Sequence, residues 1–583
     1  MKTLLVSINA KYIHSNLAVR YLREYVKGLF PNTEIAEFNI NQPLQLIRSQ
    51  IVDAKPDVLG ISCYIWNWDM VQKLVSDIKS VLPAVTIVLG GPEVSYDVQE
   101  HLIRSPAVDF IIRGEGEEPL RQLLTKLAAD QAPEQWAHTV PGVVYKGTDD
   151  RARVEPYQMD LGQLASPYGG SLDQLESKVL YYEASRGCPY RCSFCLSSLS
   201  GVVRFVPLER VFRDLERLLN LQPKQIRFVD RTFNAHPERA LTLVRWMAKQ
   251  ATKTRFQLEI TGDALRDELV DAFLEAPPHR FQLEIGVQST SEQALTGVQR
   301  RSDLQRLYRT VTTLRQGKTP IRVMLDLIAG LPHESLETFG RSFDAVYNLQ
   351  PTKIHLGFLK FLRGSQLREE AGHLGYVFQE HPPYEILASP WLDVEDLQHL
   401  HVVEDLVERY YNSGRFQYSL PWLIAANGGS PFRFYSHLAR WWRQHRLHLR
   451  GHSSVQLYPL LLDYADFVPK KQLQGRLGVD FRVNHRTQPL PVELELEDAS
   501  NEVQRWLDSS TLDQKFPQFQ GLSARQIRKR LHSLRLPHAI IETADANVDD
   551  SAVGGQIVLF HYRDLQVPAE VLPLAPSRNF VVD

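Results

Sequence analysis

The sequence contains little cysteine and almost no net charge. Only four cysteines occur in 583 residues, and the formal net charge at pH 7 is −2. So few cysteines exclude the disulfide framework of a small secreted protein. The balanced charge excludes a strong overall attraction to nucleic acid or to an anionic membrane surface.

Long apolar runs are also missing. No stretch approaches the roughly 18 apolar residues that would span a bilayer. The N-terminal stretch MKTLLVSINA leads from a short apolar run into polar residues, which fits a first strand better than a signal peptide. We therefore expect a cytoplasmic protein with no membrane partner.

The chain length suggests several domains, about three or four at ~150 residues each. Short apolar runs alternate with amphipathic helical stretches at the start of the chain, which predicts an α/β fold with a doubly wound, Rossmann-like parallel sheet. Such sheets bind ligands at the carboxyl ends of their strands. The expected strands cover residues 3–8, 34–40, 57–65, 86–91 and 109–114.

The same alternation resumes after a loop-rich connector. Six further strand and helix units predict a partial (β/α)6 barrel, with its active groups at the C-terminal ends of the strands. The expected strands cover residues 179–185, 225–230, 255–263, 280–288, 321–330 and 353–361. The domains expected are residues 1–135, a connector at 136–175, the barrel at 176–370 and a C-terminal domain at 371–583.

The C-terminal domain shows a looser pattern, which predicts a mixed α/β or mainly helical fold. Strand signals occur at 492–498, 556–562 and 579–583, and basic stretches at 437–450 and 524–535. Basic residues with aromatics are compatible with RNA binding. Because the overall charge is near zero, we favour amphipathic helices with exposed arginines and with Trp441 and Trp442 in the core.

Three of the four cysteines lie within eight positions. Cys188, Cys192 and Cys195 follow the spacing C-x3-C-x2-C in the loop after the first expected barrel strand. A [4Fe–4S] cluster held by three thiolates keeps one iron open for chemistry. A zinc site is less favoured because no second cysteine pair exists, and Cys63 lies in another expected domain.

The stretch RGCPYRCSFC, residues 186–195, resembles the radical S-adenosylmethionine (SAM) superfamily. The resemblance implies that the open iron binds SAM and that the reduced cluster cleaves it to a 5′-deoxyadenosyl radical. Downstream motifs match at the expected strand ends. The resemblance assigns SAM contacts to Phe194, Asp230, Glu259, Glu284, Gln288, Ser289, Asp326 and Leu331.

The segments GGPE and RGEGE resemble the cobalamin-binding domain that precedes one large subgroup of these enzymes. Glycines at strand ends let a bulky ligand approach the backbone, although they can also simply form tight turns. The motif Asp-x-His-x-x-Gly is absent, so we expect no histidine on cobalt and read His14 as a polar loop residue. The candidate cobalamin contacts are Asn9, Tyr12, Ser62, Tyr64, Trp66, Gly90, Gly91, Glu93, Gly114, Glu115 and Gly116.

The resemblance implies a cobalamin-dependent radical SAM enzyme that methylates an unactivated carbon or phosphorus. An enzyme that forms a ring or rearranges its substrate is the alternative, and a cluster-containing RNA- or protein-binding module is an alternative of another class. We expect a small-molecule or peptide substrate rather than nucleic acid, and an external electron donor such as flavodoxin or ferredoxin. The C-terminal domain is expected to act as a lid.

Overall fold

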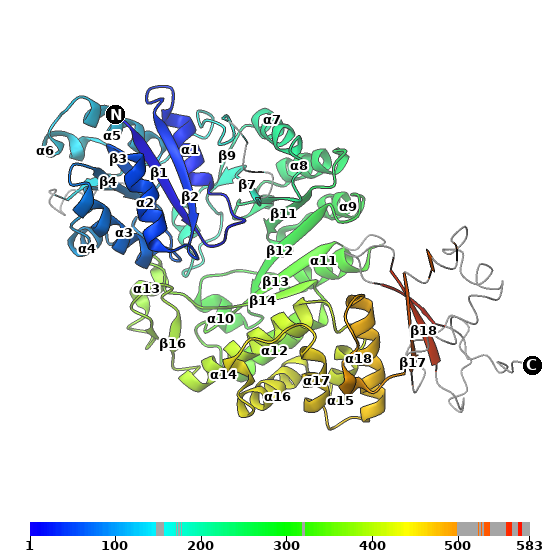
Figure 1. The fold of residues 1–583 in the computed structure, drawn as a ribbon. Coiled ribbons are helices and arrows are strands. Elements are labelled where there is room, and N and C mark those ends of the chain that lie inside the picture. Colours follow the sequence, from blue (N-terminus) through cyan, green and yellow to red (C-terminus); the bar gives the residue numbers. More distant parts are fainter. Residues whose placement is uncertain are drawn as a thin grey trace, which may run out of the picture. The chain divides into compact units, whose positions relative to one another are not determined.

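The structure is a computed structural model, drawn as a ribbon in Figure 1. Its chain divides into two compact units. The first unit contains residues 1–342 and 349–394, and the second contains residues 343–348 and 395–583. The residues described are 1–146, 157–170, 172, 175, 178–317, 321–497, 523, 526–527, 530–536, 556–562 and 569–573.

The first unit begins with a six-stranded sheet of order β2-β1-β3-β4-β5-β6. All its strands are parallel except β6, which pairs antiparallel with β5. The strand β1 is buried at every position because helices cover both faces of the sheet. The strands are Thr3–Asn9, Thr33–Asn39, Val58–Ser62, Thr86–Gly90, Phe110–Ile112 and Val143–Tyr145.

Two apolar cores cover the two faces of this sheet. One core joins the sheet to α2 (Leu44–Ala54), α3 (Trp68–Val81) and α4 (Val98–Arg104). The other joins it to α1 (Leu17–Val26) and α5 (Glu117–Ala128). The expectation of a doubly wound Rossmann-like domain is therefore confirmed.

The second sheet of this unit is wholly parallel, with the order β14-β13-β12-β11-β10-β7. Burial alternates along β12 because one face packs against helices and the other faces the inside of the partial barrel. All six expected barrel strands are present. They are β7 (Leu180–Tyr182), β10 (Gln225–Phe228), β11 (Arg255–Ile260), β12 (Phe281–Gln288), β13 (Arg322–Ala329) and β14 (Lys353–Phe358).

Helices connect the strands of the second sheet, as a β/α barrel requires. Two short strands, β8 (Ser185–Arg186) and β9 (Arg204–Phe205), pair antiparallel beside the cysteine loop. The larger helices are α7 (Leu208–Leu219), α8 (Pro237–Lys249), α9 (Asp267–Leu274), α10 (Glu292–Gly297), α11 (Leu304–Gln316) and α12 (Leu336–Asn348). After β14 come α13 (Gln366–Glu370) and the strand pair β15 (Val377–Phe378) and β16 (Ile386–Ala388).

Backbone pairing joins the two sheets within the first unit. The loop after β1 meets the start of β7, where the Val179 N–H donates to the Ile13 carbonyl at 2.7 Å. The Ser15 hydroxyl donates to the Val179 carbonyl at 3.1 Å. The carboxyl end of β1 is therefore fixed next to the first barrel strand.

The second unit is mainly helical, as expected for the C-terminal domain. Its aromatic core includes Trp442, and the exposed positions of α16 carry Arg433, His437 and Arg440. The amphipathic reading is therefore confirmed up to Gln444, where α16 ends, and Trp442 lies in the core as expected, whereas Trp441 is only half-buried. The helices are α14 (Val394–Leu406), continued by a π-helical turn at Val407–Asn412, α15 (Leu420–Ala426), α16 (Pro431–Gln444), α17 (Leu457–Tyr464) and α18 (Lys470–Asn484).

Strands appear at the end of this unit, in a three-stranded antiparallel sheet. The strand expected at 556–562 is present as β18 (Gln556–His561), between β17 (Leu531–Leu536) and β19 (Glu570–Pro573). The strand expected at 492–498 is wrong at its start, because Val492–Leu494 forms a 3-10 turn directly after Pro491. The expected strand at 579–583 and parts of the basic stretch 524–535 lie outside the described residues.

Across the described part of the chain, no helix is both long enough and apolar enough to cross a membrane.

Gly91 follows β4 and has a backbone conformation that other residues rarely adopt. Its φ is +110°, and an added Cβ would lie 2.5 Å from the Cys63 carbonyl oxygen. Replacement by alanine should therefore destabilise the first domain by about 1–3 kcal/mol and lower its melting temperature in differential scanning calorimetry. The matched control is Gly28→Ala, because an added Cβ there meets nothing within 4 Å. Equal melting temperatures for the two variants would contradict the prediction.

Candidate functional site

The three clustered cysteines lie in the loop that follows β8. Gly187 begins the loop with a φ of +102°. Cys188 Sγ lies 3.5 Å from the Thr232 hydroxyl, and Cys192 Sγ lies 3.7 Å from Arg300 Nη1. The Cys195 N–H donates to the Cys192 carbonyl at 3.0 Å, so the loop turns back on itself. All three thiols are free of disulfides and available as ligands.

The arrangement of these cysteines differs from that of a mononuclear metal site. Among the described residues, no group of three or more His, Cys, Asp or Glu converges as one ion would require. An iron–sulfur cubane takes each thiolate at a different iron, so its ligands need not converge on one point. Three thiols in one short loop are a donor set that a [4Fe–4S] cluster with one open iron can use.

Asp230 supports the start of the cysteine loop. It follows β10 and is buried, and its two carboxylate oxygens accept from the Ala184 N–H at 2.9 Å and the Ser185 hydroxyl at 2.5 Å. Burial raises the pKa of Asp230 to about 7. Both oxygens already have partners in the chain, so Asp230 fixes the two residues that precede Arg186.

Charged groups gather on the inner face of the partial barrel. Arg227 of β10 donates to Glu284 of β12 at 3.1 Å and lies 3.8 Å from Glu259 of β11. On β13, Asp326 lies 3.6 Å from the ring of His355. Burial raises the pKa values of Glu259 and Asp326. Three of the expected SAM contacts thus share one polar surface inside the barrel.

The other expected SAM contacts lie in different surroundings. Ser289 is fully buried and donates to Glu334 at 2.5 Å, and burial raises the pKa of Glu334 to about 7. Gln288 ends β12 with a φ of +69°. Leu331 is fully buried, and Phe194 is half-buried beside the cysteines.

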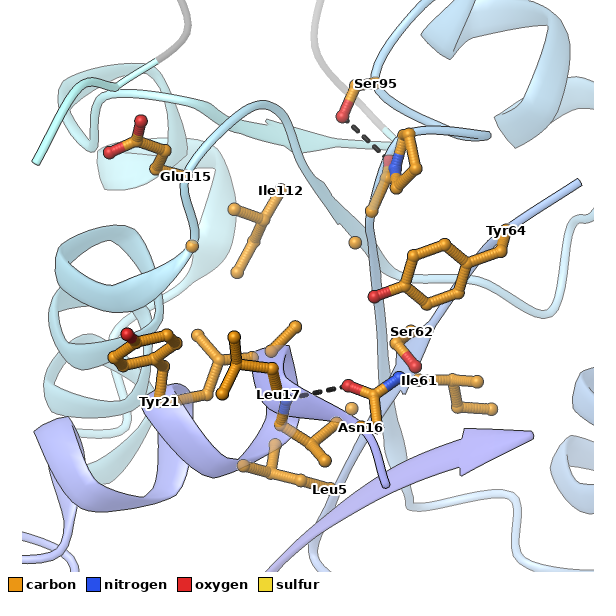
Figure 2. A pocket seen from close by; sticks show the side chains of 18 of the residues that line it. Leu5, Asn16, Leu17, Tyr21, Ile61, Ser62, Tyr64, Ser95, Ile112 and Glu115 are labelled. Atoms are coloured by element: carbon orange, nitrogen blue, oxygen red, sulfur yellow. Dashed lines mark hydrogen bonds between the residues drawn. The ribbon is translucent and has the colours of Figure 1, made fainter. Parts of the chain in front are cut away.

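A cavity of about 770 Å³ lies at the carboxyl ends of β1, β3, β4 and β5. Figure 2 shows one wall with Ile61, Ser62 and Tyr64, which faces Tyr21 and Ile112 across the space. Of the eleven expected cobalamin contacts, nine line this cavity. They are Asn9, Ser62, Tyr64, Trp66, Gly90, Gly91, Gly114, Glu115 and Gly116.

Two expected contacts lie outside the cavity lining. Tyr12 is 65% exposed, and the Lys178 ammonium lies 3.8 Å from its ring centre. Glu93 is buried and accepts a hydrogen bond from the Tyr384 hydroxyl, while Arg363 lies 3.9 Å away. Glu93 therefore helps to fix the loop after β4 against the segment that follows the barrel.

Local hydrogen bonds hold the cavity walls in place. Asn67 donates to the carbonyls of Ile8 and Ser62, and Trp66 also donates to Ile8 at 3.1 Å. The rings of Tyr64 and Trp66 stack with centres 4.3 Å apart. These contacts fix the loop after β3 on the end of β1.

Small residues keep the cavity deep. An added Cβ at Gly60 would lie 2.9 Å from Leu5, and one at Gly116 would lie 3.2 Å from Leu22. Leu5 and Gly60 both line the cavity, together with the apolar side chains of Val88, Leu89 and Ile112. The residues therefore form a mainly apolar slot between the sheet and its helices, which suits a bulky ligand.

Part of the cavity lining comes from the barrel domain, which sequence reasoning missed. Tyr181 and Arg227 contribute from β7 and β10, and Arg186 contributes from the strand that precedes the cysteines. His14 also lines the cavity, and its Nδ1 lies 2.5 Å from the Tyr181 hydroxyl. Burial and the nearby cations Lys11, Arg227 and Lys178 lower the pKa of His14. The cavity thus connects the first sheet to the catalytic end of the barrel.

Three protein-family models match successive parts of the chain. Residues 3–124 match the B12 binding domain, residues 182–346 match the Radical SAM superfamily, and residues 372–560 match a protein of unknown function, DUF4080. The chain carries these three domains in that order. The family expected from the cysteine loop and from the glycine-rich strand ends is confirmed.

Curated relatives include two methyltransferases, one of which is named as cobalamin-dependent and radical SAM. The cobalamin-dependent radical SAM methyltransferase TokK of Streptomyces tokunonensis is 30% identical over 317 residues, which are 51% of this chain and 45% of TokK. A 2-(S-pantetheinyl)-carbapenam-3-carboxylate methyltransferase of Streptantibioticus cattleyicolor is 28% identical over 302 residues, 49% of this chain and 44% of the relative. The chain thus spans less than half the length of each.

A solved structure shares the fold over most of the chain. The cobalamin-dependent SAM radical enzyme OxsB, with aqua-cobalamin bound, superposes with a TM-score of 0.58 at 16% identity. The match covers 87% of this chain and 84% of OxsB. The architecture of this chain is therefore that of a known cobalamin-binding radical SAM protein.

Proposed function

We propose that this protein is a cobalamin-dependent radical SAM enzyme that methylates an unactivated carbon or phosphorus atom of its substrate. The observation that carries the proposal is the shared cavity, whose lining combines the strand ends of the first sheet with β7, β10 and the segment before the cysteines. A cofactor in that cavity is close to any reaction inside the barrel. Methyltransferases among the relatives support the same reaction class.

Three groups of residues have distinct tasks in this proposal. Cys188, Cys192 and Cys195 hold a [4Fe–4S] cluster, the polar inner face of the barrel holds SAM, and the cavity holds cobalamin. When the cluster, SAM and cobalamin are bound together, they supply a radical that removes a hydrogen atom and a methyl group that replaces it. The chain positions the groups and excludes water from the space between them.

The individual SAM and cobalamin contacts expected from the sequence are part of this proposal. Glu259, Glu284 and Asp326 are the best placed for SAM, since they share the inner face of the barrel. We propose that Asp230 positions the cysteine loop, because its carboxylate is already engaged with Ala184 and Ser185.

Partners and location also remain proposals. The substrate is a small molecule or peptide, and an external flavodoxin or ferredoxin delivers the electron that reduces the cluster. We further propose that the protein is cytoplasmic, that its domains have the boundaries expected from the sequence, and that residues 371–583 act as a lid.

Cluster binding can be tested by replacing Cys188, Cys192 and Cys195 together with alanine. The anaerobically reconstituted variant should lose its iron, its brown colour and the low-temperature spin signal of the reduced protein, because no thiolate ligands remain. Cys63→Ala is the control, since Cys63 is fully buried in the first domain and should leave the iron content unchanged. A full cluster in the triple variant would refute the assignment.

The coordination of cobalt can be tested by electron paramagnetic resonance of protein loaded with cobalamin and then reduced. We expect no nitrogen splitting from a histidine, because the sequence lacks the Asp-x-His-x-x-Gly motif and His14 has other neighbours. His14→Ala should therefore give the same spectrum as the wild type. Nitrogen splitting that disappears in His14→Ala would show that this histidine binds cobalt.

The reaction can be tested with methyl-deuterated SAM, reconstituted enzyme and a metabolite extract under anaerobic conditions. Mass spectrometry should find a deuterated methyl group on one metabolite, and the triple cysteine variant should produce none. Substrate-dependent 5′-deoxyadenosine without transferred label would instead support ring formation or rearrangement. A protein that never cleaves SAM reductively would support the alternative of a structural cluster.

A further inference from the structure

Arg186 connects the cysteine loop to the first domain. It lies two residues before Cys188, and its guanidinium contacts three carboxylates. Its Nε donates to Glu183 at 2.9 Å, while Nη2 pairs with Glu117 at 2.6 Å and Nη1 with Glu115 at 3.1 Å. Glu117 is the first residue of α5 and Glu115 lies in the loop just before it, so these ion pairs cross from one α/β domain to the other.

The ion network around Arg186 is short of positive charge. Arg204, the second arginine of the network, pairs with Glu115 and donates to the Met159 carbonyl at 2.6 Å. Three carboxylates therefore share two guanidinium groups. The side chain of Arg186 is 13% exposed and that of Glu117 is 4% exposed, so water screens these charges poorly. An additional hydrogen-bond donor would stabilise the network.

Glu117 carries a carboxylate oxygen that lacks such a donor. Its Oε1 accepts from Arg186, whereas its Oε2 is buried and has no hydrogen-bond partner among the described residues. Glu117 also lines the cavity beside Glu183 and Arg186. A buried carboxylate oxygen without a donor is destabilising, so a ligand that donates to it gains affinity.

Arg186 also sets the geometry of the cysteine loop. The residues before it are held by Asp230, and Gly187 after it has a φ of +102°. The Tyr21 ring lies 5.3 Å from the guanidinium carbon on the cavity side. Arg186 is thus the last side chain that anchors the backbone before Cys188.

We propose that Glu117 accepts a hydrogen bond from a primary amide of cobalamin bound in the cavity, and that Arg186 transmits the position of Glu117 to the cysteine loop. This inference rests on the proposed function, since it assigns a new contact within the proposed cobalamin site. Arg186 is a positioning residue in this scheme. Cobalamin binding and the environment of the cluster are therefore coupled.

The contact can be tested by titrating apo-protein with cobalamin and following its absorbance. Glu117→Gln should weaken binding about tenfold, the equivalent of one lost charge-assisted hydrogen bond. Glu118→Gln is the matched control, because Glu118 is the next residue on α5, lies outside the cavity lining and bonds to Arg121, Tyr25 and Gln122. It should bind cobalamin like the wild type. Glu117→Asp, which keeps the charge but withdraws the oxygens, should also weaken binding.

The coupling can be tested by the spin signal of the reduced cluster, measured with and without cobalamin. The wild-type signal should change on cobalamin binding, whereas Arg186→Gln, compared at equal iron content, should lose that response. Wild-type affinity in both Glu117 variants, or an unchanged response in Arg186→Gln, would overturn this inference but not the proposed function. If neither the wild type nor Glu118→Gln binds cobalamin, the proposed function itself fails.

Discussion

The arrangement of the candidate site depends on the short backbone pairing between Ile13–Ser15 and Val179. A parallel sheet offers its ligand-binding loops at one edge only, and so does a β/α barrel. The pairing places these two edges together, because residue 179 directly precedes the first barrel strand. The cavity and the cysteine loop can share Arg186 only in this arrangement.

A second contact fixes the other side of the cavity. The loop after β4 carries Gly91, which lines the cavity, and ends at Asp97, the residue before α4, while Glu100 lies in the first turn of that helix. Arg363, from the segment after the barrel, pairs with Asp97 at 2.8 Å and with Glu100 at 2.9 Å. The cavity is therefore held at two points by contacts between residues that are distant in sequence.

Local patterns in the sequence predicted most of the fold of the first unit. Eleven of the twelve strands of the two sheets lie where the sequence pattern predicts them, and only β6, in the expected connector, was missed. The cysteine spacing marks its loop without any knowledge of tertiary contacts. Nine of the eleven expected cavity residues were found for the same reason, since strand ends and glycines are visible in the sequence. The sequence predicted a strand at 492–498 because Val, Glu and Leu residues alternate there. The prediction was wrong because Val492–Leu494 forms a 3-10 turn directly after Pro491.

The charged part of the site could not be predicted in this way. Arg186 contacts Glu117 across 69 residues, and the sequence shows only that both are charged. Glu93 is a polar residue in a strand-end loop, as a ligand contact would be. Its carboxylate instead accepts a hydrogen bond from Tyr384, which is 291 residues away in the sequence. Such pairings depend on how the domains pack against each other. The residue pattern within either segment does not predict that packing.

The strand β6 changes how the first domain can be separated from the rest of the chain. It comes from the connector, and it covers the open edge of β5 with antiparallel hydrogen bonds. A fragment that stops before Val143 would expose the unpaired N–H and C=O groups of β5 to other chains, which is the usual origin of edge-to-edge aggregation. An isolated cobalamin-binding fragment that stays monomeric therefore has to include residues 143–145.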